Sequence, residues 1–62
     1  MTEFHSEIRS HAQSAMESLR GARESGDDYL ASVREAELEN LARLADEHGL
    51  RIPELAGFAA SA

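Results

Sequence analysis

One short polar break divides an otherwise helical chain into two halves. The break is the run Ser25-Gly26-Asp27-Asp28, and apolar residues recur at intervals of three and four for about twenty residues on each side of it. Glycine can adopt the left-handed conformation that ends a helix, and serine or aspartate can cap the first free amides of the next one. Because the link is so short, the two helices must lie antiparallel. The chain is therefore predicted to be all-α and to fold as a helical hairpin.

Two long helices make up most of the predicted structure, within a single domain over residues 1–62. Helix 1 is expected over about residues 3–24, with Thr2 as its N-cap. Helix 2 is expected over about residues 28–48, and Gly49 suits the position just after its last turn. The inward-facing residues are predicted from their spacing. They are Phe4, Ile8, Ala12, Ala15, Leu19 and Ala22 in helix 1, and Leu30, Val33, Leu38, Leu41, Leu44 and Ala45 in helix 2.

The C-terminal tail has the pattern of a third, short helix. Pro53 suits the first position of a helix, which is expected over about residues 53–60. Ile52, Leu55 and Phe58 recur at every third residue, so they share one side. We predict that this apolar side docks on the hairpin.

The apolar faces of the two helices are wider than one hairpin requires. A chain this short buries only about 60 % of the surface that its unfolded form exposes, so its stability on its own is marginal. Each helix carries three columns of inward-facing residues at heptad spacing, whereas a simple coiled-coil seam uses two. The extra column predicts a further helix, most simply from a second copy, in a homodimeric four-helix bundle. The predicted dimer or partner interface comprises Ile8, Ala12, Ala15, Leu19, Leu30, Arg34, Glu37, Leu38, Leu41 and Leu44.

Two charged residues interrupt the apolar face of helix 2. Arg34 and Glu37 are three residues apart, a spacing at which opposite charges pair on a helix. In a hairpin centred on Gly26, Glu37 lies level with Ala15 and within a turn of His11, so a contact between Glu37 and His11 is within reach. Our first interpretation is a pair that sets the register of the helices or of a dimer. The alternative is a pocket around Glu37 that holds a ligand, a metal ion or a group from a partner.

No motif for catalysis, phosphate binding or metal coordination stands out. Carboxylate-bridged di-iron bundles use Glu-x-x-His on their helices, but no glutamate stands three residues before His5, His11 or His48. The chain lacks cysteine, so it can form neither a disulfide nor a thiolate zinc site. We therefore expect no catalytic residues, no cofactor and no metal, in a protein that is not an enzyme.

The net charge of −6 disfavours nucleic acids and anionic membranes as partners. No apolar run approaches the roughly 20 residues of a membrane span, and the first residues do not resemble a signal peptide. We expect a cytoplasmic protein whose partner is a second copy of itself, with another protein as a further candidate. All six basic residues are arginine and alanine is abundant, a bias typical of GC-rich bacterial genomes.

These expectations favour a small bacterial module for protein–protein interaction or regulation. One alternative is a DNA-associated transcriptional regulator, because residues 44–60 have the apolar spacing of a helix-turn-helix motif. The second helix of that motif would carry a single charge, the negative charge of Glu54, where contacts to phosphates and bases require basic or amide groups. The other alternative is the ligand or metal site around Glu37.

Overall fold

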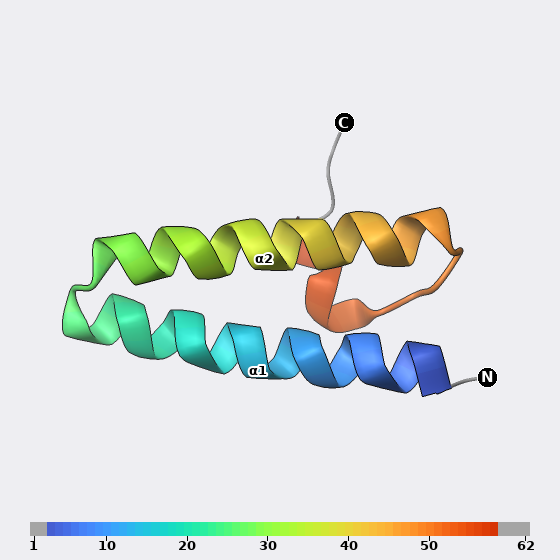
Figure 1. The fold of residues 1–62 in the computed structure, drawn as a ribbon, viewed down its shortest axis with the longest axis horizontal. Coiled ribbons are helices and arrows are strands. Elements are labelled where there is room, and N and C mark those ends of the chain that lie inside the picture. The colour runs from blue at the N-terminus through green and yellow to red at the C-terminus, as the bar shows by residue number, and fades with distance from the viewer. Residues whose placement is uncertain (1–2, 59–62) are drawn as a thin grey trace.

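The computed structural model describes residues 3–58, which form a hairpin of two α-helices and a short third helix (Figure 1). α1 spans Glu3–Ser25, α2 spans Asp28–Glu47, and the 3-10 helix η1 spans Pro53–Phe58. α1 and α2 lie side by side and antiparallel, and the described residues contain no strand. The prediction of an all-α hairpin with a short C-terminal helix is confirmed. The four-helix bundle stays a prediction, because the structure contains one chain.

Two details of the predicted helices lie outside the described residues. These are the N-cap at Thr2 and the last two positions of the tail helix, residues 59–60. The described part of the tail helix, six residues long, is a 3-10 helix rather than an α-helix. The 3-10 form is the one that proteins use for such short pieces, because it closes its first hydrogen bond one residue earlier.

The link between α1 and α2 is a glycine turn followed by a side-chain cap. Gly26 has a φ of 76°, and the amide of Asp27 donates to the carbonyl of Ala22 at 2.8 Å. This bond across a left-handed glycine is the Schellman motif, which satisfies the last free carbonyls of a helix. The carboxylate of Asp27 then accepts from the amide of Leu30 at 3.0 Å, so Asp27 is the N-cap of α2. The two residues between the helices therefore each have a role: Gly26 ends α1 and Asp27 starts α2.

The part of the core contributed by α1 follows the predicted stripe. Its buried residues are Ile8, Ala12, Ala15, Leu19 and Ala22. Phe4, the first residue of the stripe, is instead 44 % exposed. Its ring packs edge-on against that of His48, with the two centroids 4.9 Å apart. Phe4 lies at the open end of the hairpin, where α2 ends beside it and leaves little structure to cover it.

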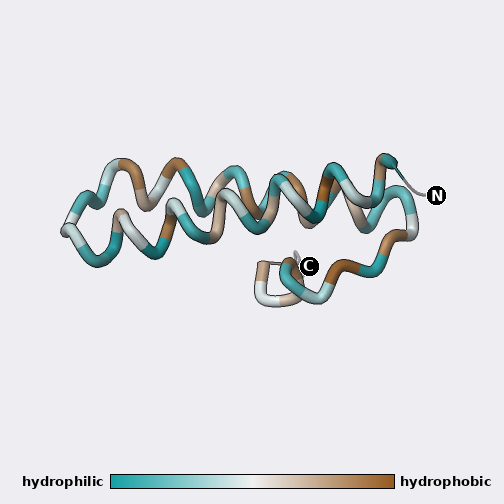
Figure 2. Tube along the Cα trace, turned by 90° about the horizontal axis from the view of Figure 1, so that it is seen from below, coloured by the Kyte–Doolittle hydropathy of each residue, from teal (hydrophilic) through white to brown (hydrophobic). Residues whose placement is uncertain are grey.

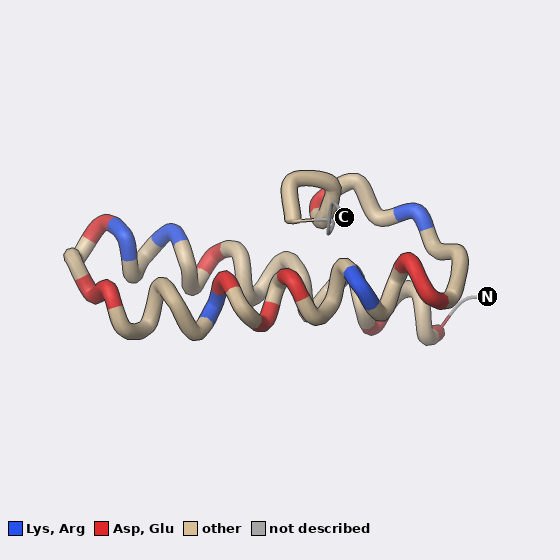
Figure 3. Tube along the Cα trace, turned by 90° about the horizontal axis from the view of Figure 1, so that it is seen from above, with Lys and Arg blue, Asp and Glu red and all other residues tan. Residues whose placement is uncertain are grey.

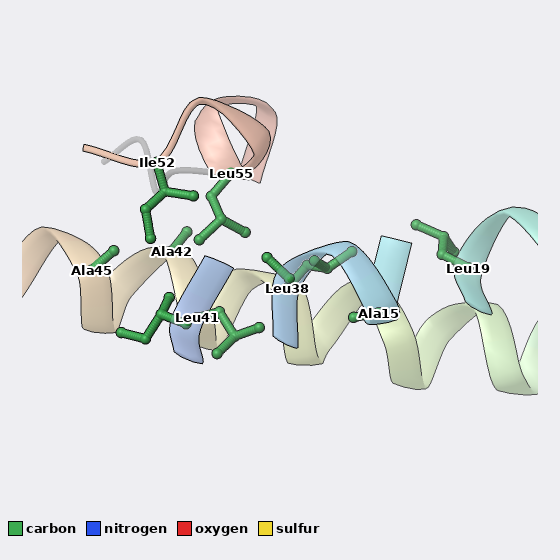
Figure 4. Packing of buried hydrophobic residues seen from close by; sticks show 10 residues of the cluster. Ala15, Leu19, Leu38, Leu41, Ala42, Ala45, Ile52 and Leu55 are labelled. Carbon is green, nitrogen blue, oxygen red and sulfur yellow. The ribbon is translucent and has the colours of Figure 1, made fainter. Parts of the chain in front are cut away.

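The buried face of α2 differs from the predicted one, as if the helix were rotated about its own axis. Leu30 and Leu44 are predicted to face inward but are only half-buried, and Val33 is 37 % exposed. Ala42, which the predicted stripe omits, is buried. The side chains of Ile52 and Leu55 in the tail lie over this Ala42 side of α2 (Figure 4).

The tail lies against one side of the two-helix layer and leaves the other side uncovered (Figure 2). Ile52 and Leu55 are 6 % and 3 % exposed, and Phe58 packs partly buried against the same core. We call the covered side the tail face; it includes Arg9, Gln13, Ala42 and Ala45. We call the opposite side the open face; it includes Phe4, His11, Ser18, Leu30, Val33, Arg34, Glu37 and Leu44.

Gly21 tests how much helix propensity contributes to the stability of α1. It is exposed inside the helix, and a Cβ at this position would meet nothing within 4 Å. Glycine in a helix interior costs roughly 0.5–1 kcal/mol relative to alanine. Gly21→Ala is therefore expected to raise the free energy of unfolding by about that amount and the Tm by roughly 2–8 °C. Thermal unfolding followed by circular dichroism measures it, and an unchanged or lower Tm would contradict the prediction.

Candidate functional site

Four polar side chains, joined by hydrogen bonds and one close His–Glu contact, cross the open face from one helix to the other. Arg34 donates from Nε to the hydroxyl of Ser18 at 3.0 Å and from Nη1 to Oε1 of Glu37 at 2.8 Å. The other oxygen of Glu37, Oε2, lies 2.8 Å from Nε2 of His11. Ser18 and His11 belong to α1, whereas Arg34 and Glu37 belong to α2. We call this set the polar bridge; it contains both the Arg34–Glu37 pair and the Glu37–His11 contact anticipated from the sequence.

The polar bridge lies at the surface rather than in the core. The side chains of Arg34 and Glu37 are 33 % and 27 % exposed, and that of His11 is 60 % exposed. Ion pairs at such positions contribute only about 0–1 kcal/mol to stability, because water screens them and their side chains lose entropy. What the structure shows of the bridge is its placement: it joins Ser18 and His11 of α1 to Arg34 and Glu37 of α2.

The geometry of the polar bridge does not favour a bound metal ion. Within residues 3–58, no three His, Cys, Asp or Glu side chains are placed to hold one. Each oxygen of Glu37 already has a partner, and the guanidinium of Arg34 lies where a cation would have to approach. The alternative of a metal site around Glu37 therefore gains no support from the arrangement.

Apolar side chains flank the polar bridge at both ends of the open face. Leu30 and Val33 precede it on α2, and Leu44 follows it on the same side of the helix. Val33 is 37 % exposed and Phe4, at the other end, is 44 % exposed. The open face is therefore apolar at its ends and polar in the middle.

The predicted interface residues are divided between the interior of the hairpin and the open face. Those buried inside the single chain are Ile8, Ala12, Ala15, Leu19, Leu38 and Leu41. Leu30, Arg34, Glu37 and Leu44 keep exposed surface on the open face. Heptad columns could not separate these two sets, since neighbouring columns on a helix differ by only part of a turn. The exposure of Phe4 and Val33, which the prediction leaves out of the interface, has no signal in the sequence.

The tail is anchored to the tail face by apolar packing and by hydrogen bonds at its edge. Its apolar side chains lie in the same buried cluster as the small residues Ala12 and Ala42. At the edge, Oε2 of Glu54 accepts from Nε of Arg9 at 2.9 Å and from Nε2 of Gln13 at 3.1 Å. The other oxygen, Oε1, is buried and has no hydrogen-bond partner among the described residues. The carboxylate of Glu54 thus ties the tail to α1, although only one of its two oxygens is hydrogen bonded.

The remaining charges are spread along both helices, and the tail carries few (Figure 3). Arg20 pairs with both Glu17 and Glu24 along α1, and Arg23 reaches across to Glu35 of α2 at 2.7 Å. The hydrogen bond from Arg20 holds the pKa of Glu17 below its ordinary value. These exposed pairs keep the two arginines close to carboxylates of the same chain.

Acid is expected to weaken the attachment of the tail. The hydrogen bond from Arg9 holds the pKa of Glu54 below its ordinary value of 4.5, with smaller contributions from the backbone and from Gln13. Because the folded-state pKa is lowered, the stabilisation is complete above the unfolded-state pKa and is lost as the pH falls through the folded-state value. Wild type should therefore melt above Glu54→Gln at neutral pH, with the difference in Tm shrinking in acid. A difference that is independent of pH would contradict this assignment.

Comparison with protein-family models, with curated proteins and with solved structures finds no match to this chain. Over the described residues, neither α-helix has the combination of length and apolar character needed to cross a bilayer. From residue 44 to residue 58 the chain holds the end of α2 and the 3-10 helix η1, not the two α-helices of a helix-turn-helix. Function is therefore inferred from the two faces of the hairpin.

Proposed function

We propose that the protein is a protein–protein interaction module whose copies pair through the open face, and that it acts by binding rather than by catalysis. The observation that supports this most is the composition of that face. Phe4 and Val33 expose apolar surface near its two ends, and Arg34 and Glu37 place one positive and one negative charge between them. A surface of this kind is complementary to itself.

We expect the two copies to be related by two-fold symmetry. In a symmetric dimer the same patch faces itself, so each contact occurs twice. When two copies of α2 run antiparallel about an axis near Arg34 and Glu37, each arginine meets the partner's Glu37. The apolar ends are then brought together on either side. The charges of this pair cancel within the contact, whereas the chain as a whole has a net charge of −6.

The open face has the dimensions that a small interface needs. The longest extent of the protein is 37 Å, and specific interfaces bury roughly 600–1,000 Å² on each partner. A chain of this size also gains much from association, because its own core is small. Covering Leu30, Val33 and Leu44 would add apolar burial that the single chain lacks.

Two matched variants test the proposal. Val33→Glu places a charge on the open face, whereas Ser32→Glu makes the same change of net charge at an exposed residue that lies about 100° round α2. By sedimentation velocity at micromolar concentration, wild type and Ser32→Glu are expected to be dimers, and Val33→Glu a helical monomer of 6.8 kDa. Circular dichroism confirms that both variants remain folded.

A well-folded wild-type monomer at the same concentration would contradict the proposal. So would a dimer that Val33→Glu and Ser32→Glu disrupt equally, because the contact would then not be specific to the open face.

A further inference from the structure

His11 is the member of the polar bridge whose residue type changes charge near neutral pH. Its Nε2 lies 2.8 Å from Oε2 of Glu37, and its side chain is 60 % exposed, so it exchanges protons with solvent. Histidine side chains ordinarily titrate between about pH 5 and 8, whereas arginine stays positive and glutamate negative over that range. The neutral ring can keep the contact by donating its Nε2–H to the carboxylate. Protonation therefore adds a full positive charge to the bridge while the contact stays in place.

The described residues place three charged groups close to His11. On α1, Glu7 lies one turn earlier and lines the same surface hollow. On α2, Glu37 contacts the imidazole directly, and Arg34 lies on the other side of that carboxylate. The tail packs on the opposite face, where the charge of Glu54 is bonded to α1. The charge of His11 therefore acts mainly on the pair at the centre of the open face, with Glu7 beside it.

In the proposed dimer, the centre of the open face is electrically balanced only while His11 is neutral. Two copies bring two arginines and two glutamates to the two-fold axis, and each Glu37 lies near its own Arg34 and the partner's Arg34. Protonation of both imidazoles adds two positive charges, so each carboxylate then has three cations near it. Like charges brought together at a contact cost free energy, so the dimer binds these protons more weakly than the single chain. By reciprocity, bound protons weaken the dimer.

We propose that His11 makes pairing through the open face sensitive to pH, and that the two copies separate as their imidazoles are protonated. Pairing through the open face is itself the proposed function, on which this inference rests. The direction is opposite to the effect of the whole-chain charge of −6, which becomes less negative in acid and by itself favours association. At about 0.15 M salt, exposed charges more than about 8 Å apart are largely screened, so the groups at the contact decide the sign.

Sedimentation equilibrium of the full chain in that salt, at about pH 7.5 and about pH 5.5, measures the Kd of the dimer. We expect the Kd of wild type to be at least about fivefold higher at the lower pH, which requires proton binding at each of the two sites to be only about threefold weaker in the dimer. In His11→Gln, whose amide gains no proton, the ratio of the two Kd values should be about one or lower. His5→Gln, the same change at the other histidine of α1, should keep the wild-type ratio.

The ratio of the two Kd values separates a failure of this inference from a failure of the proposed function. A wild-type monomer at both pH values would contradict pairing itself, and the pH dependence with it. A wild-type dimer whose Kd is unchanged or lower in acid would overturn only the role of His11. An equal rise in Kd for wild type and His11→Gln, or loss of the rise in His5→Gln, would do the same. Circular dichroism is recorded at both pH values, and loss of helix in acid would overturn the inference, because separation would then follow from unfolding.

Discussion

Leu38→Ala is expected to leave most of the protein unfolded at room temperature. Leu38 has no exposed surface and is the largest fully buried side chain among the described residues. It lies in the cluster where α1, α2 and the tail meet. Truncating a leucine at such a site costs about 2–5 kcal/mol, because burial is lost and a cavity remains. A core in a chain of this size rarely supplies more than about 3–5 kcal/mol, so the loss is comparable to the whole stability.

Urea unfolding followed by circular dichroism measures this effect. Tyr29→Ala is the matched control, since it removes a larger side chain from the same helix at a position that is 80 % exposed. Its unfolding free energy is expected to stay within about 0.5 kcal/mol of wild type. All variants are compared at one protein concentration, because association contributes to apparent stability. If Leu38→Ala unfolded at the same urea concentration as wild type, the core would not be centred on this residue.

Gly26→Val is expected to have the second largest effect. Gly26 has a φ of 76°, a left-handed conformation that costs a side chain with a Cβ about 1–2 kcal/mol and is especially unfavourable for a β-branched one. A Cβ at this position would meet nothing within 4 Å. The penalty therefore comes from the backbone conformation and not from a clash. We expect the free energy of unfolding to fall by about 2 kcal/mol.

Gly26→Asn separates the two explanations. Asparagine tolerates the left-handed conformation far better than valine does, although its side chain also begins with a Cβ. Thermal unfolding should therefore place Gly26→Asn between wild type and Gly26→Val. If the two variants melt at the same temperature, the positive φ is not what makes glycine necessary at this turn.

The tail changes the basis on which a dimer is proposed. The width of the apolar columns predicts a further helix against the hairpin. On the tail face, Ile52 and Leu55 of the same chain cover part of that width. The proposed second copy therefore concerns only what remains, which is the open face with its apolar ends.

Much of the candidate site could be predicted because it depends on local spacing. The pairing of Arg34 with Glu37 follows from their separation by three residues, and the nearness of His11 follows from counting outward from Gly26. The exposure of Val33 and the burial of Ala42 could not be predicted in the same way. Both depend on how far α2 is rotated about its own axis, and periodicity defines a stripe without stating which edge of it turns inward.

By itself, the sequence determined the antiparallel hairpin and the level at which its helices face each other. The reason is that glycine at a left-handed position, an adjacent N-cap and a link of minimal length leave one way to connect two helices. Only the tertiary structure decided which face is covered. A tail that follows Gly49 can reach either side of the layer, and the choice depends on packing over Ala42 and Ala45 together with the bond from Arg9 to Glu54. These contacts join residues far apart in the chain, so no local pattern specifies them.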